Sequence, residues 1–193
     1  MKLKISDQDI IFLSYDEPNA DANYEDLLTK IPWAKRVHGI EGSDAAHKAC
    51  ANESDSDRFV IVDADNIIDK MFLYHEVEIP DTYDVDNCVI SWSAINIING
   101  LRYGNGSIKS WTKNIINNMK THEAADKDNV HSQVDFCWGL QYFPIEECFS
   151  TVYNNGSPFQ AWRAGFREGV KLALHEGVKL TKEQLLNETI DNL

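Results

Sequence analysis

Apolar runs and helical stripes alternate along the first third of the chain. Residues 10–15 form a continuous apolar run, as expected of a strand buried on both faces. Residues 58–62, which contain the apolar run 59–62, are the clearest strand, and residues 36–40 read as a short strand. Between them, residues 23–31 carry apolar side chains at helical spacing, and residues 43–50 predict a second helix with Ser43 as its N-cap. This strand, helix, strand, helix, strand order predicts an α/β fold with a parallel sheet.

The remainder of the chain is less regular. Residues 88–93 read as a strand, and residues 99–106 form a glycine- and asparagine-rich loop. A long helix is expected over residues 159–176, ended by Gly177, and a capping-box pattern at 181–184 opens a last short helix. The apolar stripe of the long helix is formed by Trp162, Phe166, Val170, Ala173 and Leu174. No repeat or linker divides the chain, so we expect a single domain over residues 1–193.

The composition and the length of the apolar runs bear on whether nucleic acid or a membrane can be a partner. With 31 acidic and 18 basic residues, the formal net charge of −13 opposes general affinity for nucleic acid, so any DNA contact requires a local basic patch. No apolar run approaches the roughly 20 residues of a membrane span, and the first residues do not resemble a signal peptide. We therefore expect no membrane partner and a cytoplasmic location.

The four cysteines are widely spaced. They are Cys50, Cys88, Cys137 and Cys148, and no two stand at the spacing of zinc ligands. This favours reduced thiols in the core over a zinc site.

Acidic residues follow two of the predicted strands. Asp63 and Asp65 come directly after the run 58–62, and Asp16 and Glu17 follow the run 10–15. Because ligands bind beyond the carboxyl ends of parallel strands, both loops are expected at one edge of the sheet. Paired carboxylates with open coordination positions suit Mg²⁺ or Mn²⁺ bridged to phosphates, whereas the alternative is a solvated acidic turn.

Several segments together resemble the glycosyltransferase family of T-even-like bacteriophages. They are residues 9–19, 31–34, 37–40, 46–47, 59–66, 103–106 and 161–171, and the resemblance covers about residues 9–175. It implies a GT-A-like, Rossmann-type, mostly parallel sheet flanked by helices. It also implies a nucleotide-sugar donor such as a UDP-sugar, with Asp16 and Glu17 in the nucleotide loop and Asp63 and Asp65 binding the metal on the diphosphate.

The same resemblance suggests an acceptor. Some relatives are thought to glycosylate 5-hydroxymethylcytosine in phage DNA, including by arabinosyl transfer, which would place this protein in the host cytoplasm. The rim of such an acceptor opening would need cations, for which Arg102, Lys109 and Lys113 are candidates. At 193 residues the chain is shorter than most GT-A enzymes, so its acceptor subdomain must be minimal.

The long helix carries a second group of candidate residues. Arg163, Arg167 and Lys171 recur every four residues and share one face, where guanidinium groups would bind diphosphate oxygens. The alternative is a solvated helix face. His175 follows one turn later and is a candidate third metal ligand, as a late histidine often is in GT-A enzymes, or else a surface or capping histidine.

Two further residues are candidates for the chemistry of transfer. Asp135 lies between apolar neighbours and is the first candidate for the base that deprotonates the acceptor hydroxyl, although a structural hydrogen-bonding acid fits the same pattern. His47 on the second predicted helix is a candidate lining residue of the sugar pocket.

Two other classes of protein share part of this pattern. A catalytically silent binding module would have no need to keep both Asp63 and Asp65. A nucleotidyltransferase would normally show glycine and lysine in the loop after the first strand, where residues 16–19 contain neither. The nucleotide, the sugar, the stereochemical outcome and the oligomeric state stay open.

Overall fold

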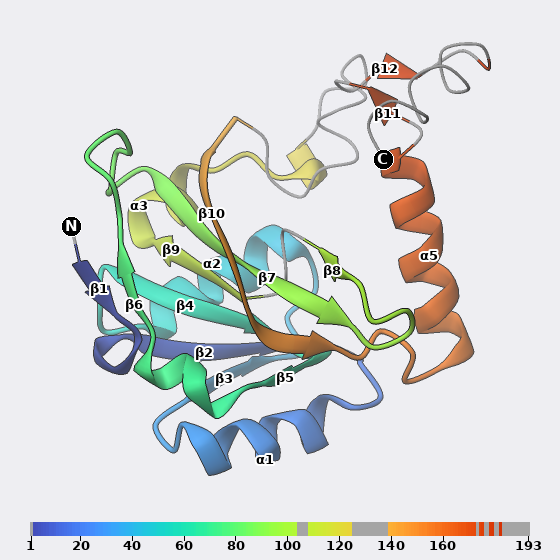
Figure 1. Cartoon of the computed structure of the whole chain (residues 1–193), viewed down its shortest axis with the longest axis horizontal. Helices are drawn as coiled ribbons and strands as arrows, with labels where there is room; N and C mark the ends of the chain where they lie inside the picture. The colour runs from blue at the N-terminus through green and yellow to red at the C-terminus, as the bar shows by residue number, and fades with distance from the viewer. Residues whose placement is uncertain are drawn as a thin grey trace.

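The computed structural model describes residues 2–103, 108–124 and 139–172, together with residues 174, 175, 178, 179 and 182. Its centre is an eight-stranded sheet in the order β3-β2-β4-β9-β7-β10-β5, with β8 paired to β7 (Figure 1). The strands are β2 (Asp9–Ser14), β3 (Lys35–His38), β4 (Arg58–Asp63), β5 (Asn66–Ile68), β7 (Cys88–Asn96), β8 (Arg102–Tyr103), β9 (Ile108–Thr112) and β10 (Gln141–Val152).

The sheet is mixed, with a parallel part where the sequence predicts one. β2 pairs in parallel with both β3 and β4, and β7 pairs in parallel with β10. The antiparallel strand β9 lies between β4 and β7, and β5 and β8 also run against their neighbours. β2, β3, β4, β7 and β10 therefore share one direction, and their carboxyl ends define one edge of the sheet.

Short elements complete the described chain. Outside the main sheet, β1 (Lys2–Lys4) pairs with β6 (Glu76–Glu78), and β11 (Leu174–His175) pairs with β12 (Val178–Lys179). The helices are α1 (Ala20–Lys30), α2 (Ser43–Glu53), α3 (Lys113–Asn118) and α5 (Pro158–Leu172), with 3-10 turns η1 (Ile5–Asp7), η2 (Lys70–Tyr74) and η3 (His122–Ala124).

Both faces of the central strands are buried. Phe12, Val60 and Val62 point into a core that α1 covers, whereas Phe59 and Ile61 point into a second core that α2 and α3 cover. Because side chains alternate between the faces of a strand, continuous apolar runs are what this arrangement requires. The prediction of strands buried on both faces is confirmed.

Two sequence-based boundaries are wrong. The N-cap of α2 is Gly42, not Ser43, and the carboxylate of Glu123 accepts hydrogen bonds from the backbone N–H groups of Ser43 and Asp44. A carboxylate at this position satisfies donors at the positive end of the helix. The long helix ends at Leu172 rather than running to residue 176, because the chain there enters the β11–β12 hairpin.

The described residues also bear on two sequence-based expectations, that no segment spans a membrane and that the cysteines are free thiols. None of its helices has the length and apolar character needed to cross a bilayer. Cys50 and Cys88 are free thiols in the core as predicted, whereas Cys148 is free but only half-buried, so the core prediction is wrong for it. Cys137 lies outside the described residues.

Candidate functional site at the carboxyl edge of the sheet

The loops that follow β2 and β4 leave the sheet side by side. Leu13 of β2 lies opposite Asp63 of β4, so residues after these positions emerge together. In the β2 loop, the Glu17 carboxylate accepts a hydrogen bond from the backbone N–H of Tyr15 at 2.8 Å, which folds the side chain over the loop, while Asp16 is exposed. Of the two predicted nucleotide-loop residues, Glu17 interacts electrostatically with Asp65.

Asp63, the last residue of β4, and the turn residues Ala64 and Asp65 that lead to β5 are called the DxD turn. Two distant segments hold its backbone. The buried Asn23 side chain of α1 donates to the carbonyl of Ala64 at 2.8 Å, and the backbone N–H of Tyr153 donates to the carbonyl of Asp65 at 2.6 Å. Within the turn region, the neighbouring Asn66 donates from Nδ2 to Oδ1 of Asp65 at 2.8 Å, which orients that carboxylate.

The two carboxylates of the DxD turn repel each other in a poorly solvated position. Burial, together with the negative charges of Asp63 and Glu17, raises the pKa of Asp65 from its ordinary 3.8 to about 7. A divalent cation beside these carboxylates would offset the repulsion and favour the ionised form of Asp65.

Buried oxygen atoms without partners lie near this turn. The side-chain Oδ1 atoms of Asn66, Asn19 and Asn154 are buried and have no hydrogen-bond partner among the described residues. Asn66 follows Asp65 directly, and Asn19 donates from Nδ2 to the carbonyl of Tyr153 at 3.2 Å, which places it beside the residue that anchors the turn. Amide and carboxylate oxygens are the ligands that Mg²⁺ and Mn²⁺ accept, so the residues present fit a hard divalent cation.

The residues of the DxD turn match a divalent cation in the type of their donor atoms, and they would leave part of its coordination open. Within the described ranges, no three His, Cys, Asp or Glu side chains are grouped as a closed metal centre. Two protein carboxylates with further positions left for phosphate oxygens is the usual arrangement where a cation is shared with a nucleotide.

His47 lies on the α2 side of the same edge. Its pKa is lowered by burial, against an opposing effect from the negative charge of Asp63, so the ring is neutral at pH 7. Nδ1 is 2.9 Å from the carbonyl of Ser43, which can only accept, so Nδ1 carries the proton. The ring also contacts Trp111 edge to face, with centroids 5.7 Å apart. The structure therefore brings His47 close to Asp63 and holds it in one tautomer.

A polar network at the ends of β2 and β3 was not singled out by the sequence. Arg36 donates to Oγ of Ser14 at 2.9 Å, pairs with Asp21 at 2.8 Å, and lies over the ring of Tyr24. Oγ of Ser14 is also 2.9 Å from Nδ1 of His38. Arg36 and His38 are two residues apart on β3 and therefore lie on the same face of the strand. This spacing was the feature of the sequence that could have predicted the network.

The arginines of α5 are not brought against the DxD turn. Arg163 and Arg167 are exposed, and within the described residues neither has a hydrogen-bond or ion-pair partner. Their role in diphosphate binding stays a prediction. His175 does not continue their helical stripe as expected, since it lies in β11 beyond the end of α5, and its side chain is not described. Asp135 lies outside the described residues.

The three cations proposed for an acceptor rim do not form one rim. Arg102 pairs with Glu146 at 3.5 Å, and Lys113 donates to the carbonyl of Ser54 at 2.8 Å, near the amino end of β4. Lys109 lies on β9 and is close enough to His47 to lower its pKa. The antiparallel direction of β9 separates Lys109 from Lys113, which is why proximity in sequence was misleading.

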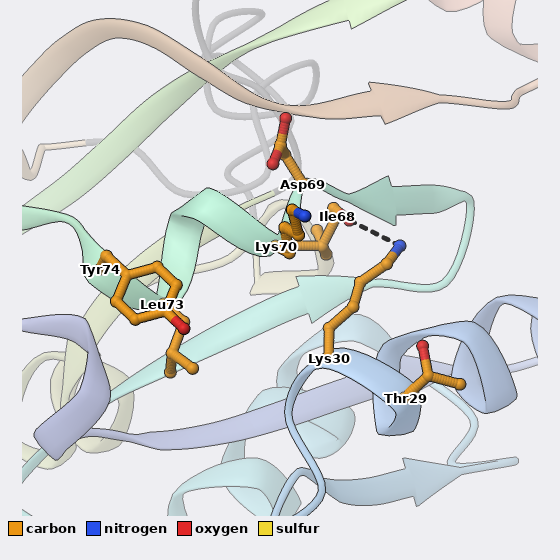
Figure 2. Close-up of a pocket in the computed structure, with 7 residues that line it drawn as sticks. All are labelled: Thr29, Lys30, Ile68, Asp69, Lys70, Leu73 and Tyr74. Atoms are coloured by element: carbon orange, nitrogen blue, oxygen red, sulfur yellow. Dashed lines mark hydrogen bonds between the residues drawn. The ribbon is translucent and has the colours of Figure 1, made fainter.

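Two hollows in the surface lie away from this edge. Figure 2 shows the larger one, of about 490 Å³, between the end of α1 and the η2 turn. Lys30 within it is already bound, to Asp26 at 2.5 Å and to the carbonyl of Ile68 at 2.8 Å. The second hollow, of about 410 Å³, lies beside Asn87 and Asn114 near the start of β7. Neither contains residues of the DxD turn, so the chemistry of the donor set, not concavity, identifies the candidate site.

Comparisons with known proteins assign no family. No protein-family model matches the chain, and no curated protein sequence matches it. Among solved structures, HddC from Yersinia pseudotuberculosis is similar at 18% identity, over 86% of this chain and 80% of that chain, with a TM-score of 0.32.

Proposed function

We propose that this protein is a metal-dependent glycosyltransferase of the GT-A type that uses a nucleotide-sugar donor. The observation that carries the proposal is the DxD turn, in which two carboxylates and a partnerless buried amide oxygen are held rigidly at the carboxyl edge of an α/β sheet. Such an edge is where α/β proteins bind nucleotides. The phage-family resemblance points to the same residues.

Each group at the edge has a role in this proposal. Asp63 and Asp65, with Asn66 behind them, would hold Mn²⁺ or Mg²⁺, which supplies positive charge against the donor diphosphate. The β2 loop with Asp16 and Glu17, and the Arg36 network beside it, would hold the nucleoside. His47, which interacts with Asp63 and contacts Trp111 of β9, would line the pocket of the sugar.

The reaction moves a glycosyl group. A bond forms between the acceptor oxygen and the anomeric carbon of the sugar, and the bond from that carbon to the diphosphate oxygen breaks with its electron pair leaving on the nucleoside diphosphate. The hydroxyl proton passes to a base, for which Asp135 remains the candidate, or to the departing phosphate. A cation held by Asp63 and Asp65 would supply positive charge at the diphosphate and so favour its departure, which is the role proposed for the carboxylate pair.

For the acceptor, we propose 5-hydroxymethylcytosine in DNA on the basis of the family resemblance. The chain's net charge of −13 opposes approach to a phosphate backbone, so such binding would depend on a few Lys and Arg side chains near the acceptor opening. Contacts between these cations and phosphates weaken as salt is added. Transfer should fall steeply with added salt and should be absent on unmodified cytosine. Equal transfer to a free saccharide or a protein, with none to hydroxymethylated DNA, would overturn this part and leave the donor half intact.

A thermal-shift screen tests the donor half. UDP-, GDP- and CDP-sugars are added with and without Mn²⁺, because a ligand that binds only the native state raises the melting temperature. The expected result is a shift with one nucleotide class that needs the cation and disappears in Asp65→Asn. The matched control is Asp81→Asn, an exposed acid without a hydrogen bond or ion pair in the described structure. Equal shifts in both variants would contradict the proposal.

A further inference from the structure

Helix α5 exposes a row of large aromatic side chains. Phe159, Trp162 and Phe166 are 66%, 62% and 60% exposed, and their spacing of three and four residues puts them on one side of the helix. These three residues are called the aromatic face of α5. Exposed rings gathered in one place usually mark a surface that binds something.

The aromatic face lies close to the candidate donor site along the chain. Tyr153, which anchors the DxD turn through the carbonyl of Asp65, is also bound by Asn19 and precedes α5 by five residues. Figure 1 shows α5 at the margin of the molecule. Whatever binds the aromatic face would therefore be held near the carboxyl edge.

Positive charge accompanies the rings. Arg163 and Arg167 each follow one of the aromatic residues, are exposed, and have no ion-pair partner among the described residues. Elsewhere, cations are commonly paired with acids: Lys2, Lys4, Lys30, Lys35, Arg36, Lys48 and Arg102 all form ion pairs. In a chain of net charge −13, α5 thus offers cations to an external anion.

The geometry of the rings disfavours nucleic acid as the partner. Phe159 stacks on Trp162 with centroids 6.0 Å apart, and Trp162 stacks on Phe166 at 5.5 Å with planes 19° apart. A base occupies about 3.4 Å along a strand, so inserting one between two rings needs about 7 Å. A base therefore cannot be inserted between these rings as they stand, and the ring edges and the outer faces of Phe159 and Phe166 are left for a partner.

The size of the face disfavours a second copy of the chain. Aromatic side chains bury about 150–250 Å² each, so three rings that are two-thirds exposed offer about 300–450 Å². A stable interface needs about 800 Å² from each partner. An aromatic edge flanked by arginines is instead typical of helices that lie in a membrane interface, with rings among the acyl chains and guanidinium groups at the headgroups.

We propose that the aromatic face of α5, with Arg163 and Arg167, is a docking surface for an anionic lipid bilayer. The helix lies in the plane of the interface and does not cross it, and the acidic remainder of the protein faces water. None of the described helices is suited to cross a bilayer, as expected, and the proposal concerns only a helix that lies at the bilayer surface. It does not depend on the proposed sugar transfer.

Vesicle flotation tests the docking surface. The full chain is mixed with vesicles of phosphatidylcholine and phosphatidylglycerol, and with vesicles of phosphatidylcholine alone. The protein should float with the anionic vesicles, and Trp162→Ser with Phe166→Ser should weaken binding by about tenfold or more, because the apolar area that enters the bilayer is lost. Tyr74→Ser, which removes an equally exposed ring from η2, is the matched control and should bind as wild type does.

Two results would overturn the proposal. The first is no flotation of the wild-type protein with anionic vesicles, and the second is equal flotation of the double variant. If the wild type does not float but is retained on a single-stranded oligonucleotide or self-associates in light scattering, and the double variant does neither, the face binds nucleic acid or a second copy instead.

Discussion

Replacing Asp65 by asparagine should stabilise the protein when no divalent cation is present. The pKa of Asp65 is raised from 3.8 to about 7, so the folded protein binds a proton at this carboxyl more tightly than the unfolded chain does. For an acid with a raised pKa, stability is lost as pH rises between the two values and the loss is complete above the folded value. A difference of about three pH units corresponds to about 4 kcal/mol.

Asp65→Asn removes this cost without removing its hydrogen bond. The amide oxygen of asparagine can still accept from Nδ2 of Asn66, which is 2.8 Å from Oδ1 of Asp65. At pH 8 in chelator, the variant should unfold at a temperature higher by on the order of 10 °C, given 2–4 °C per kcal/mol for a chain of this size. Near pH 4, where the wild-type carboxyl is protonated, the two proteins should be alike.

Calorimetric or fluorescence melting from pH 4 to 8.5 measures the effect. Added Mn²⁺ should raise the melting temperature of the wild type at pH 8 and leave Asp65→Asn unchanged, because the cation binds the ionised pair. Asp81→Asn is the control, because Asp81 is an exposed acid, unlike the buried Asp65. A variant that is less stable than wild type at pH 8, or that keeps the same pH dependence, would refute the reasoning.

Three other expectations follow from single contacts. Asn23→Ala leaves the buried carbonyl of Ala64 without its donor, so it should lower the free energy of unfolding in denaturant by about 1–3 kcal/mol. It should also weaken Mn²⁺ binding measured by calorimetry. Unchanged values for both would show that Asn23 does not support the turn. Arg163→Gln or Arg167→Gln should weaken nucleotide-sugar binding by about tenfold, because a charge-assisted hydrogen bond to the diphosphate is lost. Nucleotide-sugar affinities within twofold of wild type would mean that these arginines do not bind the diphosphate and serve only the proposed lipid surface. Burial and the charge of Asp63 raise the pKa of Cys50 to about 12, so this thiol should resist iodoacetamide at pH 8 in the folded protein, and rapid labelling seen by mass spectrometry would contradict its environment.

The central strands and the position of the candidate site were predictable from local pattern. The central residues of β2 and β4 are buried on both faces, so they are apolar in sequence, and acidic residues stand at the end of β4 and in the loop after β2. Parallel pairing then brings Leu13 opposite Asp63, and the two acidic loops meet as expected. The position of the candidate site was predictable because the carboxyl ends of parallel strands lie at the same edge of a sheet.

Contacts between distant segments were not predictable in the same way. The cap of α2 comes from Glu123, some 80 residues further along the chain, and the anchor of the DxD turn comes from Tyr153. β9 enters between β4 and β7 by antiparallel pairing that no local period encodes. The stripe on the long helix was recognised, but periodicity reports an apolar face without reporting what covers it, and Trp162 is largely exposed.

Donor turnover with and without the cation tests the central claim most directly. Release of nucleoside diphosphate from a UDP-sugar, with hydroxymethylated DNA as acceptor at low salt, is followed in Mn²⁺ and in excess chelator. The account predicts turnover in Mn²⁺ that is abolished by chelator and by Asp65→Asn, with Asp81→Asn as active as wild type. Undiminished turnover in excess chelator would contradict the assignment of Asp63 and Asp65 as the carboxylates that hold the metal.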